Sequence, residues 1–311
     1  MRYVIALGGN ALEDGKAEAT AERQLEAIKQ AVKGIVDVVE AGHTVVITHG
    51  NGPQVGRILM QNELAQAHTP AMPFDLCGAM SQGMIGYHIQ QALRGELLRR
   101  KLSLPVATVV TQVIVDADDP AFSHPTKPIG AFYDAAEAER LTQERGYTMK
   151  EDAGRGFRRV VASPQPKTVV ELKSIEALIA SGQLVIACGG GGVPVVERDG
   201  LLHGVPAVID KDLASALLAQ EIGADQLIIL TAVEQVAIRF GQENQENLAK
   251  LSVADAKKYA SAGEFGEGSM LPKVLAGVHF AQSGEGRSTL ITSLEALGQA
   301  ISGIKGTRID A

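Results

Sequence analysis

The chain has 311 residues, of which 45% are hydrophobic, and a formal net charge of −7 at pH 7. This length can bury a large core as one domain or two lobes. The acidic balance without a basic block excludes the charge pattern of nucleic-acid-binding proteins. The apolar run at residues 3–7 is too short for a signal peptide or a membrane span. Two distant cysteines, Cys77 and Cys188, indicate neither a disulfide framework nor a metal cluster, so we expect a cytoplasmic protein.

Short apolar runs rich in valine and isoleucine alternate along the chain with stretches of helical spacing. The runs predict strands at residues 3–7, 44–48, 106–115, 184–188, 226–231 and 289–292. The stretches between them predict helices at residues 21–40, 81–102, 174–180, 211–222, 272–282 and 294–301. Because parallel strands need crossover connections, the alternation predicts an α/β fold, a three-layer αβα sandwich with a mainly parallel central sheet.

Residues 116–163 interrupt this alternation with several prolines, a charged stretch and a basic cluster. So long an excursion inside a compact domain favours a small inserted subdomain. Lys127 lies within it and can reach the main body only if the subdomain folds over as a lid, which would exclude water from a reaction. The alternative for Lys127 is a solvated loop lysine. We interpret residues 116–163 as an inserted lid subdomain.

Three glycine-rich loops directly follow predicted strands. They are Gly8-Gly9-Asn10, His49-Gly50-Asn51-Gly52-Pro53 and Gly189-Gly190-Gly191-Gly192. In an open parallel sheet the carboxyl ends of the strands share one edge, so we expect the loops to face one cleft. Glycine lets successive backbone N–H groups point at phosphate oxygens. A tight strand-to-helix turn would explain one such loop, but three together favour a phosphate site.

Two lysines follow the third loop in sequence, one within Asp210-Lys211-Asp212 and the other at Lys273. Phosphoryl transfer depends mainly on positioning and on neutralising charge, which lysines on a glycine-rich scaffold can supply. The chain lacks the Walker pattern and the protein-kinase signatures. An acid and a lysine could also simply begin an exposed helix. The sequence therefore indicates a phosphotransferase outside those two classes.

Five strings at or near these positions form one larger pattern. They are ALGGNA at residues 6–11, HGNGPQVG at 49–56, SQGMIGY at 81–87, AVIDKD at 207–212 and GSMLPK at 268–273. Together with KPIG at 127–130 they resemble carbamate kinases, of the amino acid kinase superfamily, and the resemblance spans nearly the whole chain. The second and third strings are the most specific to carbamate kinases.

The resemblance implies a reversible phosphoryl transfer between ATP and carbamate, giving ADP and carbamoyl phosphate, with Mg²⁺ accompanying the nucleotide. It implies one amino acid kinase domain over residues 1–311 and a homodimer. Residues 1–183 would form the carbamate lobe with the dimer contacts, and residues 184–311 the ATP lobe. In cells the family commonly makes ATP, from carbamoyl phosphate that arginine, agmatine or purine catabolism could supply.

The resemblance also implies roles for individual residues. The proposed catalytic residues are Lys127, Asp210, Lys211 and Lys273. The proposed carbamate and phosphoryl ligands are Gly8, Gly9, Asn10, Gly50, Asn51 and Gly52. The proposed ATP ligands are Gly189, Gly190, Lys211, Thr231, Ala232, Val233, Met270 and Lys273. In this scheme Lys211 and Lys273 neutralise charge on the phosphoryl group, Asp210 orients them, and no metal is held by the protein itself.

Two other interpretations and one departure accompany this scheme. A related amino acid kinase could act on another carboxylate, and a non-catalytic nucleotide-sensing dimer could keep the fold without the chemistry. The departure is Gly266-Glu267, where many relatives carry Ala-Pro. An extra glycine and an acid near the nucleotide predict weaker ATP binding and the same reaction.

Overall fold

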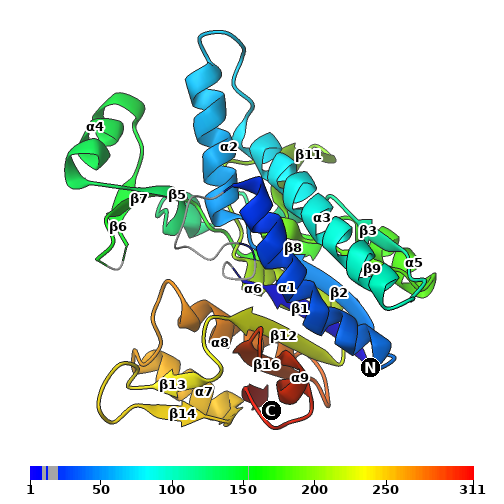
Figure 1. Ribbon diagram of the computed structural model, residues 1–311. Coiled ribbons are helices and arrows are strands. Elements are labelled where there is room, and N and C mark those ends of the chain that lie inside the picture. The colour runs from blue at the N-terminus through cyan, green and yellow to red at the C-terminus, as the bar shows by residue number, and fades with distance from the viewer. Residues whose placement is uncertain (9–11, 13–19, 153) are drawn as a thin grey trace.

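The computed structural model describes residues 1–8, 12, 20–152 and 154–311 (Figure 1). Its described part is organised around an eight-stranded sheet in the order β15-β17-β16-β12-β1-β2-β9-β3. The strands are β1 (Arg2–Leu7), β2 (Thr44–His49), β3 (Val106–Thr108), β9 (Leu184–Ile186), β12 (Gln226–Thr231), β15 (Lys250–Ser252), β16 (Ser288–Ser293) and β17 (Thr307–Asp310). Neighbouring described strands run parallel except β16 and β17. The predicted mainly parallel sheet is confirmed.

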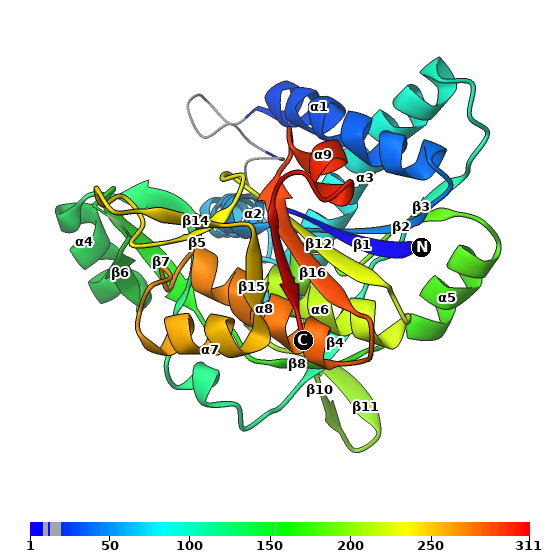
Figure 2. The same ribbon diagram turned by 90° about the horizontal axis from the view of Figure 1, so that it is seen from below.

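Helices cover both faces of this sheet (Figure 2). One face packs on α1 (Ala21–Glu40), α3 (Phe74–Arg99) and α9 (Leu297–Ile301). The other packs on α5 (Leu172–Ala180), α6 (Lys211–Glu221) and α8 (Met270–Gln282), with α7 (Val253–Ser261) beside α8. Side chains alternate across β1, with Ile5 in the first core and Val4 in the second, because successive strand residues point to opposite faces. The three-layer sandwich is therefore confirmed.

Smaller sheets extend the body. One has the order β11-β10-β4-β8 and is made of β4 (Gln112–Val115), β8 (Pro166–Val169), β10 (Val193–Arg198) and β11 (Leu201–Gly204). A two-stranded sheet, β13 (Val236–Ile238) and β14 (Glu246–Leu248), completes the body. The single strand expected at residues 106–115 is wrong, since β3 and β4 belong to different sheets. The Gln82 amide binds the Thr111 backbone N–H and C=O at 2.8 and 2.9 Å, so the chain leaves the main sheet there.

Helices α5, α8 and α9 begin within two or three residues of the predicted positions, but two other helix starts differ more. Helix α3 begins at Phe74 rather than at residue 81, because Pro73 occupies its N-cap position and the chain is helical from there. Helix α2 (Gly52–Ala65) begins within the second glycine loop, where only a loop was expected. Pro53 stands in its first turn, a position where the missing N–H of proline costs nothing.

The predicted insert contains a small sheet and a helix of its own, a segment that we call the lid. It consists of β5 (Lys127–Tyr133), α4 (Ala135–Arg145), β6 (Met149–Glu151) and β7 (Phe157–Val161), with strand order β5-β7-β6 and a preceding short 3₁₀ helix η2 (Pro120–Phe122). In Figure 1 the lid projects from the body beside α2. The two meet at Gly56 and Gly130, where a Cβ on Gly56 would lie 2.1 Å from the Gly130 Cα. Only glycine at position 56 allows this approach.

Candidate active site

The first glycine loop follows β1 at the carboxyl edge of the sheet. Gly8 is buried, and a Cβ placed on it would lie 2.6 Å from the carbonyl oxygen of Leu230 on neighbouring β12. Glycine is therefore required by the close approach of two backbones. Gly9 and Asn10, predicted ligands of the phosphoryl group, lie outside the described residues.

The second loop follows β2, the neighbour of β1. The Gly50 N–H donates to the Leu7 carbonyl oxygen at 3.2 Å, which joins the first and second loops. Asn51 is the N-cap residue of α2, and Gly52 is the first residue of that helix. Gly190, from the loop after β9, adopts a φ of +65°, and a Cβ there would lie 2.2 Å from the Asn51 Nδ2. The described parts of the three loops are thus linked by neighbouring contacts.

The Asn51 side chain is fixed by a contact that sequence reasoning missed. Its Nδ2 donates to the Ser81 Oγ at 2.8 Å, and the Ser81 Oγ donates to the Gly78 carbonyl oxygen at 2.6 Å. Both side chains are buried. The available signal was a serine on a long helix within one of the two most specific strings. Helix α3 therefore positions the second loop.

His49 and Gly189 form the inner wall behind the loops. The His49 ring is buried, and its Nδ1 lies 2.9 Å from the Gly50 carbonyl oxygen. Burial lowers the pKa of His49 to about 4, outweighing the opposing effect of that hydrogen bond, so the ring is neutral at pH 7. Gly189 begins the 3₁₀ helix η3 (Gly189–Gly191), and a Cβ on it would lie 2.4 Å from the His49 Nε2. Gly189 and Gly190, predicted ATP ligands, are buried against residues of the second loop.

Two lysines share one carboxylate beside these loops. Lys211 is the first residue of α6 and Lys273 lies in the first turn of α8. The Lys211 Nζ pairs with Asp212 Oδ1, and the Lys273 Nζ lies 2.9 Å from Asp212 Oδ2. Each carboxylate oxygen thus takes one lysine. Because α6 and α8 contact each other and the central sheet, the three side chains are fixed by the body.

Burial and ion pairing have opposing effects on the pKa values of Asp212, Lys211 and Lys273. Burial alone would raise the pKa of Asp212, but Lys211 and Lys273 lower it well below its ordinary value. Burial lowers the pKa of Lys211, although Asp212 opposes the change. Burial also acts to lower the pKa of Lys273, but Asp212 outweighs it and the pKa is raised. The Asp212 carboxylate is therefore charged at pH 7 and holds the ammonium group of Lys273.

A second ion pair joins the lid to the body. Lys127 is the first residue of β5, and its Nζ lies 2.5 Å from Asp210 Oδ2. Asp210 is the N-cap of α6, where its Oδ1 accepts the Asp212 backbone N–H at 2.8 Å. The lid returns to the body nearby, since the Val208 N–H donates to the Ala162 carbonyl oxygen at 3.0 Å. The lid thus brings Lys127 to the start of α6.

This geometry corrects one predicted contact. Asp210 was expected to orient Lys211 and Lys273, but Asp212 contacts both of them. The reason is local, because the carboxylate of an N-cap residue turns back toward the first N–H groups of its own helix. Its free oxygen then pairs with Lys127. Asp212 was part of the sequence motif, and its role could not be separated from that of Asp210 without the helix geometry.

The Lys211 side chain runs along the second glycine loop. A Cβ on Gly50 would lie 3.2 Å from the Lys211 Cδ. The start of α6 is anchored to β2 by a bond of 2.6 Å between the Thr48 and Ser215 hydroxyls, and Ser215 Oγ also donates to the Lys211 carbonyl oxygen. The structure therefore brings the lysine cluster and the predicted phosphate loop together.

The other predicted nucleotide residues lie at two separate chain positions. Thr231 ends β12, and Ala232 and Val233 follow it in the turn before β13. Met270 is the first residue of α8, one helical turn before Lys273, and packs partly on the core. These segments come from the carboxy-terminal half, whereas the first two glycine loops come from the amino-terminal half.

The arrangement can neutralise a polyanion with three lysines and hold it with backbone N–H groups. Among the described residues, no three His, Cys, Asp or Glu side chains gather in a way that could hold a metal ion. Both central carboxylates are already engaged by lysines. In the part of the chain that the structure describes, no helix is long and apolar enough to cross a membrane.

Comparisons with known proteins agree over the whole chain. The model of the amino acid kinase family matches residues 1–293. The carbamate kinase-like protein YqeA of Escherichia coli (strain K12) is 54% identical over 311 residues, which cover 99% of this chain and 98% of that protein. The carbamate kinase of Clostridium perfringens is 51% identical, with 99% of each chain covered. The solved structure of Giardia lamblia carbamate kinase bound to AMP-PNP superposes with a TM-score of 0.91 at 42% identity, covering 99% of this chain and 98% of that one.

Proposed function

The chain belongs to the amino acid kinase family and, within it, to the carbamate kinases, and from this premise we propose how its residues transfer a phosphoryl group between ATP and carbamate. The single observation that carries the proposal is the Asp212 carboxylate holding Lys211 and Lys273 beside the Gly50 loop. In this proposal the phosphoryl group is transferred beside these two positive charges.

In the direction of ATP formation, a β-phosphate oxygen of ADP bonds to the phosphorus of carbamoyl phosphate while the bond to the carbamate oxygen breaks. Carbamate leaves as an anion, so the step needs no proton transfer. Lys211 and Lys273 neutralise the phosphoryl oxygens, and Asp212 keeps both ammonium groups in place. Lys127 adds a third positive charge to the phosphoryl site from the lid, and in the absence of substrate it pairs with Asp210.

The two lobes divide the substrates in this proposal. Backbone N–H groups of Gly8, Gly50 and Gly52, with Asn51, bind the carbamate and phosphoryl end, because these loops adjoin Lys211. Gly9 and Asn10 keep the same role by sequence resemblance. The segment Thr231, Ala232 and Val233 binds the adenine, and Met270 the nucleotide beside Lys273. The AMP-PNP complex of the Giardia relative supports ATP as the nucleotide.

Gly189 and Gly190 support the site without touching ATP in this proposal. Their backbones are buried against His49 and Asn51, with no room for a Cβ. They therefore fix the shape of the carbamate loop. This assignment replaces the nucleotide contact expected from the sequence.

We propose that Mg²⁺ enters with the nucleotide. The described carboxylates at the centre of the site, Asp210 and Asp212, already pair with lysines. The main ligands of the ion would therefore be phosphate oxygens of the nucleotide. When bound, the ion neutralises the β- and γ-phosphate oxygens.

We propose a cytoplasmic homodimer. Helix α3 carries a line of exposed apolar side chains at helical spacing, Leu76, Met80, Met84 and Tyr87, which are 46%, 48%, 38% and 60% exposed. An uncovered apolar stripe of this kind favours a subunit interface. The two free cysteines are consistent with a reducing compartment. By the family resemblance, the reaction runs toward ATP, with carbamoyl phosphate supplied by arginine, agmatine or purine catabolism.

The test is ATP formation from ADP, Mg²⁺ and carbamoyl phosphate by the purified protein, beside Lys273→Ala and with acetyl phosphate as the substrate control. We expect turnover that is selective for carbamoyl phosphate and is lost in the variant. Faster turnover with acetyl phosphate would assign a different carboxylate kinase. Tight ADP binding without turnover on either substrate would assign a nucleotide sensor.

A further inference from the structure

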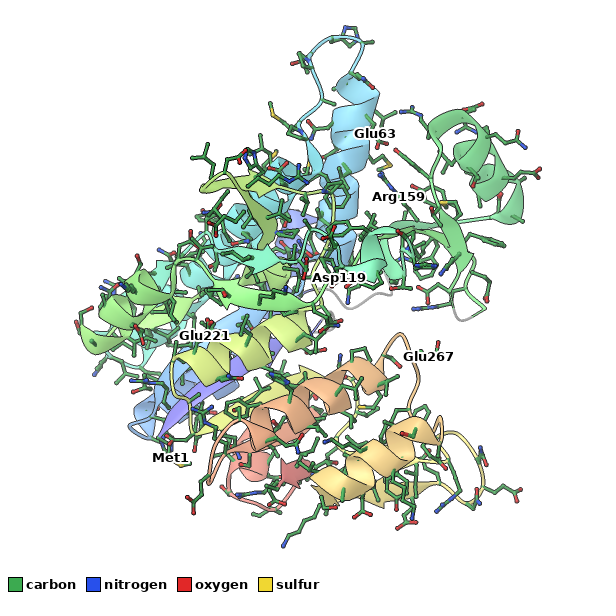
Figure 3. All side chains as sticks on the ribbon, turned by 180° about the vertical axis from the view of Figure 1, so that it is seen from behind. Met1, Glu63, Asp119, Arg159, Glu221 and Glu267 are labelled. Atoms are coloured by element: carbon green, nitrogen blue, oxygen red, sulfur yellow. The ribbon has the colours of Figure 1, made fainter. Side chains whose placement is uncertain are left out.

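A cavity of about 160 Å³ lies between α2 and the lid, outside the lysine cluster. Its walls come from the second half of α2, from β5, from α4 and from two residues of the lid sheet region, Tyr147 and Arg159. Figure 3 shows Glu63 on α2 and Arg159 on the lid on the two sides of this region. The volume matches cavities that accept one small organic molecule.

The cavity is separate from the active site. Helix α2 starts at Gly52 beside the site, whereas the cavity extends along this helix from Gly56 to Leu64, so Glu63 lies roughly 16 Å along the helix axis from Gly52. The end of the cavity nearer the site is closed by Gly56 and Gly130, which line it and bring α2 and β5 into backbone contact. A molecule in the cavity therefore cannot be one of the reacting substrates.

Arg159 presents unused hydrogen-bond donors to the cavity. Its guanidinium carbon lies 3.8 Å from the centre of the Tyr147 ring, so the group is stacked on that ring. Among the described residues, its side-chain acceptor is the Glu63 Oε1, 3.3 Å from Nη1. That oxygen also accepts the Tyr147 hydroxyl. Since a guanidinium has five N–H donors, most of those on Arg159 have no acceptor within the described part of the chain.

Two further donors face the same space. Arg145, at the end of α4, forms no ion pair within the described parts of the chain, and the Tyr133 hydroxyl forms no hydrogen bond within them. Burial raises the pKa of Tyr133, with Glu63 and Glu137 adding to the effect. Its hydroxyl is therefore protonated at neutral pH and can donate.

The acceptors at the cavity are largely occupied. Glu137 takes two N–H groups of Arg140, at 2.7 and 2.9 Å, and Glu63 Oε1 takes two donors. Among the described side chains that line the cavity, Glu63 Oε2 is the acceptor left over, whereas Arg145, Arg159 and Tyr133 keep free donors, and this excess of donors matches an anionic ligand.

The remaining wall is apolar. Leu59, Met60 and Leu64 from α2 face Ile129 and Leu141 of the lid across the cavity. Met60 is 40% exposed and Leu64 72% exposed, so part of this surface still contacts water. An apolar ligand body in the cavity would remove this exposed apolar surface from water.

We propose that this cavity is a second ligand site, for a small organic anion with a compact apolar body, such as an aromatic carboxylate. Its carboxylate binds Arg145, Arg159 and the Tyr133 hydroxyl, and its body lies between Met60 and Leu141. The occupied cavity ties α2 to the lid and so restrains β5, whose first residue is Lys127. Only this last consequence rests on the proposed function.

Benzoate titrated into the full chain, followed by isothermal calorimetry and by ligand-observed NMR, tests the site without any phosphoryl transfer. We expect saturable binding with a Kd of about 1 mM or tighter, and binding at least about tenfold weaker for benzamide, which has the same body without the charge. Benzoate should also slow hydrogen exchange of residues 127–161.

Two variants and their matched controls locate the binding. Arg145→Gln should weaken benzoate at least about fivefold, whereas Arg23→Gln on α1 should leave it unchanged. Met60→Trp should fill the cavity and abolish both binding and the slower exchange, whereas Met72→Trp, outside the cavity, should not. The absence of saturable benzoate binding below about 10 mM would overturn the proposal. Arg145→Gln and Met60→Trp variants that bind benzoate as tightly as the unaltered chain would also overturn it.

Discussion

The body and the lid hold their lysines in different ways. Lys211 and Lys273 stand on α6 and α8, which pack on each other and on the central sheet, and their side chains are only 12% and 15% exposed. Lys127 stands on the lid sheet, which packs on α2, and its side chain is 29% exposed. Both lysines of the body share Asp212, whereas Lys127 has its own partner, Asp210.

This difference indicates that the lysines of the body and the lysine of the lid have different roles. A charge cluster built on packed helices is preorganised, which suits the stabilisation of a phosphoryl group in transfer. A lysine on a separate subdomain can arrive with the substrate and exclude water when it does. Changes to the body should therefore differ in their effects from changes to the lid.

The largest expected effect is in the body. Asp212→Asn leaves two buried ammonium groups with a neutral partner, so both lysines lose their position. We expect kcat for ATP formation to fall about 10³-fold. ADP affinity, measured by calorimetry, should change much less. Asp199→Asn, in an exposed turn, is the control and should retain full activity; a loss below about tenfold in Asp212→Asn would contradict the assigned role.

The second largest expected effect is a loss of folding stability at low pH, caused by the buried His49 of the body. Burial holds its folded-state pKa at about 4, below the unfolded value of 6.5, so the unfolded chain binds the proton first as pH falls. Stability is therefore present above pH 6.5 and is lost as pH falls toward 4. Urea unfolding should show a loss of about 2–3 kcal/mol between pH 7 and 4.5.

His49→Gln should remove most of this pH dependence, and His68→Gln, at an exposed position, should not. Residues 127–161, the strands and helix of the lid sheet, contain no histidine, so this part of the lid has no such group. An unchanged pH dependence in His49→Gln would show that other groups cause it.

A smaller effect is expected where the lid meets α2. Gly56→Ala places a Cβ 2.1 Å from the Gly130 Cα, so the lid must shift away from the helix. We expect kcat to fall about tenfold, because Lys127 moves with β5. Gly95→Ala, with open space around it on α3, should raise stability by about 0.5–1 kcal/mol and leave kcat unchanged. Equal activity of the two variants would show that the lid position is not critical.

The smallest effect concerns the loop before α8. Replacing Gly266-Glu267 by Ala-Pro removes one acid and stiffens the chain ahead of Lys273. We expect ADP to bind about threefold more tightly by calorimetry, as removal of a single nearby charge allows, with the selectivity for carbamoyl phosphate unchanged. Unaltered ADP affinity would refute the idea that this departure weakens nucleotide binding.

The body was largely predictable from the sequence because its signals are local. The continuous apolar runs predicted β1, β2 and β12 to within one residue at each end, as expected for buried parallel strands. The glycine loops and lysines followed from motifs at strand ends. These features depend on neighbours in the chain.

The rest depends on contacts between distant residues. The split of residues 106–115 into two strands follows from the Gln82 amide, which binds the backbone 29 positions away. Asp212 holds the two lysines in place of Asp210 for two reasons. Asp210 caps its own helix, and it pairs with Lys127, which is 83 positions away in the chain. The buried places of Gly189 and Gly190 follow from the folding of the second loop onto them.

The most direct test of the division between body and lid compares Lys127→Ala with Lys273→Ala in one assay of ATP formation, together with calorimetric ADP binding. Both variants should lose kcat. ADP affinity should fall at least about tenfold in Lys273→Ala and stay unchanged in Lys127→Ala. The KM for carbamoyl phosphate should rise mainly in Lys127→Ala. Equal losses of ADP affinity in both variants, with an unchanged KM for carbamoyl phosphate in Lys127→Ala, would contradict the account.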